Sequence, residues 1–162
     1  MIRHGKYYYH HQQQIPLERS ITHLLEECRM VLPGVQALFG FQLIVVFNNG
    51  FDQKLDHNAQ MLHYCALILV SLSAALIMAP AAFHRIASPQ AVSKPLLNLF
   101  TRLLMWGMVP LALGICLDLY LIGTLITSGI WALLLAVLVF MVLVALWFGA
   151  PEWMRVHYRR EH

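Results

Sequence analysis

Charged residues are scarce in this chain. Only 12% of its 162 residues are Asp, Glu, Lys or Arg, while 59% are hydrophobic, and the mean hydropathy is +0.63. A soluble globular domain typically carries about 25% charged residues. Half of that share leaves too few charges to cover a water-facing surface, which excludes most classes of soluble enzyme. One domain is expected at this length.

Cysteine is equally sparse, and the three cysteines stand far apart, at Cys28, Cys65 and Cys116. Without a C-x-x-C pair they indicate neither a zinc framework nor a disulfide scaffold. Each is expected to pack as a small apolar residue. The nucleophile elbow, the phosphate-binding loop and the H-E-x-x-H motif are missing too. We therefore expect no enzymatic activity, no catalytic residue and no metal site.

Long apolar runs are what the chain does contain. The run from 129 to 150 has no charged residue, and Trp131 and Trp147 lie 16 residues apart near its ends. That spacing is about 24 Å along a helix, close to the separation of the two headgroup boundaries where tryptophan concentrates. About 20 apolar residues cross a bilayer. The run is predicted to be a transmembrane helix, with Trp131, Trp147 and Trp153 as interface anchors.

Four spans are predicted, at about 33–50, 60–84, 96–121 and 129–150. Before them, apolar residues at helical spacing predict an amphipathic interfacial helix over 16–32, with a bend where Pro33 disfavours helical geometry. The expected fold is an all-α membrane protein with four transmembrane helices plus this interfacial helix. Residues 1–15 form a polar N-terminal arm, 16–150 a single membrane domain, and 151–162 a basic tail.

The distribution of lysine and arginine predicts the orientation of the chain in the membrane. With four spans, ten Lys and Arg residues fall on the side of both termini and Lys54 alone falls on the other side. Because positive loops stay in the cytoplasm, both termini are expected to be cytoplasmic. The net charge of +3 is then a topology signal, and no nucleic-acid partner is expected.

A polar collar is predicted at the cytoplasmic helix ends. Ionisable groups at this level of the membrane are costly and tend to pair. The collar is interpreted first as ion pairs that fix helix ends and bind anionic lipid headgroups. A proton or cation access site, with Glu26 or Glu27 titrating, and a docking surface for another subunit are the alternatives. Its members are Glu26, Glu27, Arg29, His84, Arg85 and Arg102.

Polar residues within the spans are few. Gln36 and Gln42 lie in the first span, and interhelical hydrogen bonding is the usual role of such amides. Asp118, near the outer end of the third span, is the carboxylate nearest to the membrane interior. Sodium:proton exchangers generally need a titratable carboxylate near the midplane, so this pattern argues against a self-contained antiporter.

A cofactor is not expected, although bound lipid is. His63, in the second span, is the candidate axial ligand for a haem or chlorophyll, which the sequence leaves open. A transmembrane b-type haem usually needs a second axial ligand on a facing helix, and the third and fourth spans contain no histidine.

Two motifs carry a resemblance to a known family. Residues 24–47 read LLEECRMVLPGVQALFGFQLIVVF, and residues 79–85 read APAAFHR. This order, an E-x-R, then L-P-G-V-Q, then a closing A-P-x-x-F-H-R, resembles a bacterial family of small four-helix membrane proteins of uncharacterised function. Its members are often labelled sodium:proton antiporters. The resemblance covers roughly residues 17–125 and implies four spans in a bacterial cytoplasmic membrane, inner or intracytoplasmic.

Three functions follow as hypotheses. The first is a non-catalytic accessory or scaffold subunit of a larger membrane complex, respiratory or photosynthetic, packing through apolar helices. The second is an oligomeric cation or proton transporter with the collar at its mouth. The third is a haem- or pigment-binding membrane protein. The expected partners are membrane lipids and other membrane subunits or further copies of this chain.

Overall fold

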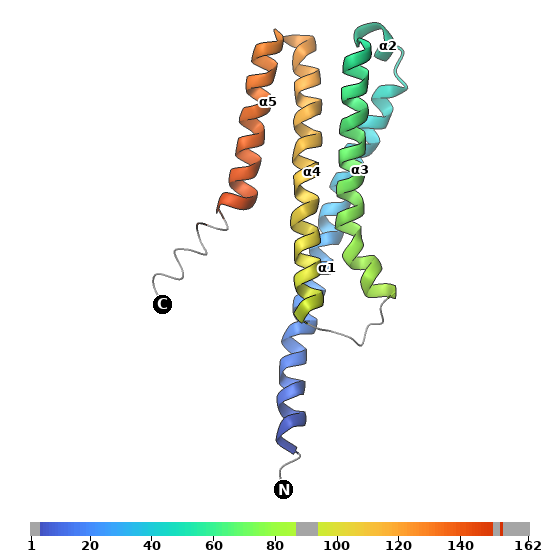
Figure 1. Cartoon of the computed structure of the whole chain (residues 1–162). Helices are drawn as coiled ribbons and strands as arrows, with labels where there is room; N and C mark the ends of the chain where they lie inside the picture. Colours follow the sequence, from blue (N-terminus) through green and yellow to red (C-terminus); the bar gives the residue numbers. More distant parts are fainter. Residues whose placement is uncertain (1–3, 87–93, 151–152, 154–162) are drawn as a thin grey trace. The chain divides into compact units, whose positions relative to one another are not determined.

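The computed structural model describes residues 4–86, 94–150 and 153, with side chains from residue 17 onward. Within these ranges the chain is helical and contains no strand (Figure 1). The elements are α1 (His4–Val46), the short α2 (Phe51–Lys54), α3 (His57–Ile86), α4 (Lys94–Ile126), α5 (Gly129–Val144) and a π-helical turn, η1 (Ala145–Gly149).

Four of the helical segments are long and apolar enough to cross a membrane. They run over Leu17–Val46, His57–Ile86, Lys94–Ile126 and Gly129–Gly149. The predicted all-α membrane fold with four transmembrane helices is therefore confirmed. The helix ends lie within a few residues of the predicted spans, with two exceptions: α1 begins far before residue 33, and α4 continues to Ile126.

The N-terminal part of the chain is simpler than the sequence predicts. The polar arm, the predicted interfacial segment and the first span form one helix that begins at His4 and runs through Pro33 to Val46. A proline keeps a helical φ, and the apolar residues on both sides of Pro33 favour continuing the helix in an apolar environment, where every backbone group needs a partner within the segment. The predicted basic tail, 151–162, lies outside the described residues apart from Trp153.

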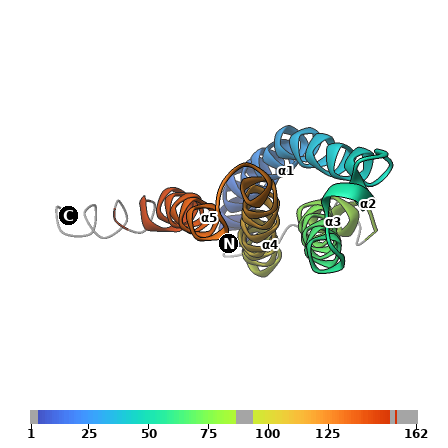
Figure 2. The same cartoon turned by 90° about the horizontal axis from the view of Figure 1, so that it is seen from above.

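The helices divide into two compact units, each built from parts of α1, α3 and α4. Unit 1 comprises residues 1–40 and 71–108, and unit 2 comprises 41–70 and 109–162. Figure 2 looks along α3 and α4, which run antiparallel and side by side. In unit 1 the core contains Ile21, Leu24, Ile77 and Phe100. The last turns of α3 bend in this unit (Figure 1), as expected from Pro80 inside the helix.

In unit 2, small residues let helices approach closely. A Cβ atom added to Gly114 of α4 would lie 2.8 Å from Val70 Cγ2 and 3.3 Å from the carbonyl oxygen of Ala66, both on α3. A Cβ atom on Gly123 would lie 2.9 Å from the Cβ of Ala132 on α5. Such close backbone approach is the usual way in which membrane helices pack. It sets the spacing of α3 and α4 one turn away from Asp118.

Candidate proton-binding site

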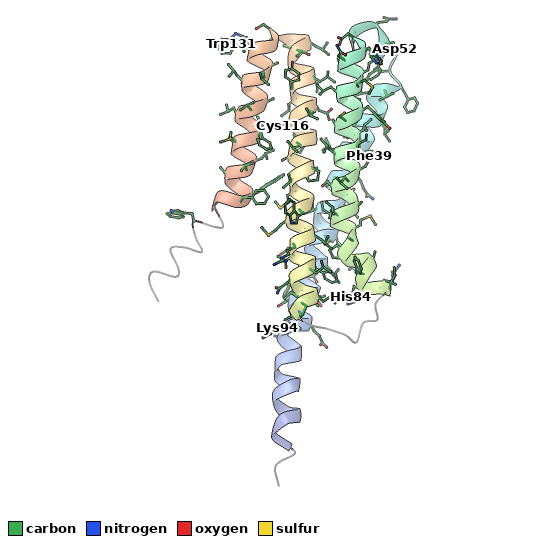
Figure 3. All side chains as sticks on the ribbon, viewed as in Figure 1. Phe39, Asp52, His84, Lys94, Cys116 and Trp131 are labelled. Atoms are coloured by element: carbon green, nitrogen blue, oxygen red, sulfur yellow. The ribbon has the colours of Figure 1, made fainter. Side chains whose placement is uncertain are left out.

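Three polar side chains from three helices meet inside unit 2. Gln42 lies in the last turns of α1, His63 in the second turn of α3, and Asp118 in the second half of α4. Figure 3 labels Cys116, two residues before Asp118 on α4. The side chains of His63 and Asp118 are 4% and 15% exposed, and Gln42 is 4% exposed. The three polar groups bond to one another.

The hydrogen bonds link all three helices. Gln42 Nε2 donates to Asp118 Oδ2 at 2.5 Å. His63 Nδ1 lies 3.1 Å from Asp118 Oδ1, and His63 Nε2 lies 3.0 Å from the backbone carbonyl oxygen of Gln42. Both ring nitrogens and both carboxyl oxygens are therefore engaged within the site.

The two ring nitrogens of His63 each face an oxygen. Nδ1 lies beside Asp118 Oδ1 and Nε2 beside the carbonyl oxygen of Gln42. Which nitrogen donates depends on the tautomer of the ring. A proton shared between His63 and Asp118 would satisfy both contacts at once.

Two further features shape the site. The ring of Phe51, from α2, packs edge-on against the ring of His63, with centroids 5.7 Å apart and planes at 61°. Gln42 Oε1 is buried and has no hydrogen-bond partner among the described residues. A buried acceptor without a partner costs about 1–3 kcal/mol. The site therefore has one acceptor beside Asp118 to which a proton-donating molecule would bond.

The depth of the site follows from the helices. His63 lies six residues after the start of α3 and Asp118 eight residues before the end of α4. These separations are about 9 Å and 12 Å along the helix axes. The hydrocarbon core is about 30 Å thick. The pair therefore lies within one leaflet, close to the start of α3, which follows α2, and to the end of α4, which precedes α5.

The other predicted polar residue of the first span does not join the site. Gln36 is exposed and forms no hydrogen bond in the described part of the chain, so the interhelical bond predicted for it is absent.

The predicted interface anchors differ in exposure. Trp131 and Trp153 are exposed, by 61% and 65%, and Trp147 is half-buried. Such positions are compatible with contact to lipid.

The predicted collar lies in unit 1 but is not ion-paired. Glu26, Glu27, Arg29, Arg85 and Arg102 are exposed and His84 is half-buried. Within the described ranges, Glu26 pairs only with His23, at 3.5 Å, and no carboxylate lies within 4 Å of the three arginines. The ion pairs predicted for the collar are thus not formed, because long exposed side chains gain little from pairing.

The metal and haem alternatives find no ligand set here. In the part of the chain that is described, no three His, Cys, Asp or Glu side chains are close enough to hold a metal ion. Both nitrogens of His63 are occupied by hydrogen bonds. Axial ligation by His63 would require it to give up one of them.

These observations define an all-α membrane protein with a buried His–Asp pair inside a bundle of apolar helices. A protein-family model described as "Family of unknown function (DUF6328)" matches residues 10–151. The chain belongs to this family. No curated protein and no solved structure matches it.

Proposed function

We propose that this protein is a proton-linked membrane transporter, of protons alone or of a cation together with protons, whose proton site is the His63–Asp118 pair. The observation that carries the proposal is the geometry of that pair, in which an imidazole nitrogen and a carboxyl oxygen lie 3.1 Å apart inside the helix bundle. Ionisable groups within membrane helices are rare and mark ion and proton pathways. A purely structural link between helices needs only uncharged amides or hydroxyls.

The pair also couples protonation to helix contacts. Loss of the shared proton leaves a lone pair on Nδ1 of His63 facing the Asp118 carboxylate, and the contact between α3 and α4 becomes repulsive. Gln42 is bonded to both partners, so a change at the pair is felt by α1 as well. Gln42 Oε1, which has no partner among the described residues, offers an acceptor for a proton-carrying water beside Asp118. Proton release and helix movement are thereby linked.

Other charged groups at this end of unit 2 differ from the pair in exposure. Asp52, Lys54, Asp56 and His57 are all exposed. Asp56 accepts a hydrogen bond from the backbone of Ala59, and Asp52 accepts one from Gln60. In our proposal this end lies outside the cytoplasm, as the Lys and Arg distribution predicts, and the pair lies in the outer leaflet.

The test is proton flux in liposomes that contain the full chain and an internal pH indicator. A pH gradient, with and without a sodium gradient, drives the flux. We expect flux in the wild type, and its loss in Asp118→Asn and His63→Gln with the helical circular dichroism unchanged. Asp52→Asn and Asp56→Asn, which remove exposed carboxylates at the same end, are the matched controls. Absence of flux in the wild type, or equal flux in Asp118→Asn, would reject the proposal.

A second candidate function is an accessory subunit of a larger membrane complex of respiratory or photosynthetic type. The observation that favours it is α5, which is apolar on every face and buries only Ala132 and Ala136. A partner helix would have this surface to pack against. Extraction from the native membrane in mild detergent, followed by mass spectrometry, tests it. Stoichiometric co-purification with a large assembly supports the accessory role, and a small homo-oligomer contradicts it.

A further inference from the structure

A hollow lies in unit 1, between α1 and the C-terminal turns of α3. It has a volume of about 690 Å³. Leu25 and Arg29 line it from α1, and Met78, Ala82, His84 and Arg85 are among the residues that line it from α3. Ligand sites of drug-like molecules have volumes of about 300–1,000 Å³, so the hollow has the size of a binding site.

The lining of the hollow consists of a group of basic side chains and an apolar wall. Arg29 and Arg85 supply two guanidinium groups, His84 supplies an imidazole, and none of the described residues that line the hollow is a carboxylate. The two carboxylates that precede Arg29 on α1 have other neighbours: Glu26 pairs with His23, and Glu27 lines a different hollow, against α4. The wall formed by Leu25, Met78 and Ala82 is apolar. This lining is complementary to a molecule with an anionic head and a hydrocarbon tail.

The position along α3 agrees with that chemistry. α3 has 30 residues, so it is about 45 Å long, whereas the hydrocarbon core is about 30 Å thick. Its last turn, with His84 and Arg85, therefore reaches the headgroup level. Ala82 lies within one turn of this pair, and Met78 lies about two turns deeper, towards the level of the acyl chains.

We propose that this hollow binds one anionic phospholipid. The phosphate group accepts hydrogen bonds from the guanidinium groups of Arg29 and Arg85, which match its geometry in bidentate fashion. His84 lies beside it as a further donor. An acyl chain lies against Leu25, Met78 and Ala82. Charge complementarity selects the anionic head, and the apolar wall selects a lipid over a free anion. The site is independent of the proposed proton site, which belongs to unit 2.

The test is native mass spectrometry of the full chain in mild detergent, with phosphatidylglycerol or phosphatidylcholine added at equal concentration. We expect one retained phosphatidylglycerol per chain and little phosphatidylcholine. Arg29→Gln combined with Arg85→Gln lowers phosphatidylglycerol affinity about tenfold or more, the loss of at least 1.4 kcal/mol. Arg19→Gln, an exposed arginine of α1 outside the hollow, leaves the affinity unchanged.

Ala82→Phe provides a second variant, which keeps all three basic groups and fills the apolar wall. It is expected to weaken phosphatidylglycerol binding, and circular dichroism confirms that the helices are intact. Equal retention of the two lipids would overturn the proposal, as would an equal effect of Arg19→Gln and the double variant. Displacement of phosphatidylglycerol by millimolar inorganic phosphate would also overturn it, by showing that the site takes a free anion.

Discussion

His63 of α3 and Asp118 of α4 face each other across two antiparallel membrane helices, with Nδ1 and Oδ1 3.1 Å apart. The two residues are 55 positions apart in the chain. Their contact lies one turn from the close approach at Gly114, so the backbone spacing that the glycine permits determines whether the two side chains can share a proton. This relationship generates most of the predictions below.

The first prediction concerns the protonation of His63. Because Nε2 lies 3.0 Å from a backbone carbonyl oxygen, the proposed shared proton predicts a hydrogen on Nε2, which ¹⁵N NMR of histidine-labelled protein in lipid would detect. The Nδ1 signal reports whether the shared proton lies on the ring or on Asp118. A neutral ring with its hydrogen on Nδ1 alone would contradict the proposed shared proton. His63→Gln assigns the signal among the nine histidines of the chain.

The second prediction concerns the stability contributed by the site. Asp118→Leu removes the acceptor of the hydrogen bonds from Gln42 and His63. Interhelical hydrogen bonds in membranes are worth about 0.6 kcal/mol each, and up to about 1.7. We expect the free energy of unfolding in mixed micelles to fall by about 1–3 kcal/mol. Asp52→Leu, at an exposed position of α2, should leave it nearly unchanged.

The third prediction isolates the close approach of α3 and α4. Gly114→Ala places a Cβ atom 2.8 Å from Val70 Cγ2, and such overpacking costs about 1–3 kcal/mol. The variant is expected to unfold more easily and to lose proton flux. Gly34→Ala is the matched control, because a Cβ atom there meets nothing within 4 Å. Replacing glycine in a helix by alanine should instead stabilise it by about 1 kcal/mol.

The fourth prediction tests the orientation. A single cysteine at Gln53, in α2, is introduced into a chain whose three natural cysteines are replaced by alanine. It is expected to react with a membrane-impermeant maleimide added to intact cells, because Lys54 is the only basic residue on that side of the predicted topology. A cysteine at Lys94, at the start of α4, should react only after the cells are opened. The reverse pattern would invert the topology and place the proton site in the cytoplasmic leaflet.

The sequence predicted the helices well but not their meeting points. Hydrophobic runs and the tryptophan pair were enough for four spans, because length and composition decide whether a helix crosses a bilayer. They do not decide which faces meet, since membrane helices are apolar on all sides. Gln42, His63 and Asp118 were each singled out, but as an amide, a ligand candidate and an isolated carboxylate. All three residues lie a few turns or less from helix ends that short connections join, and this pattern was the signal in the sequence that they could meet.

The collar shows the opposite error. Its charges were expected to pair because ionisable groups at the headgroup level of a membrane are costly. The structure instead turns Glu26 towards His23 and leaves Arg29 and Arg85 to line a hollow whose described residues include no acidic group. Proximity in sequence does not specify which side of a helix a charge occupies, and residues three positions apart share a side while adjacent ones do not.

The shared proton has a consequence for the membrane voltage. Whether it resides on nitrogen or on oxygen, the His63–Asp118 pair carries no net charge, so the field across the bilayer does no work on it as a unit. Once the proton leaves, one negative charge remains at a depth where part of the voltage is felt, and a full crossing is worth about 2.3 kcal/mol per 100 mV. With the proposed shared proton, a voltage dependence of this pair therefore belongs to its deprotonated state.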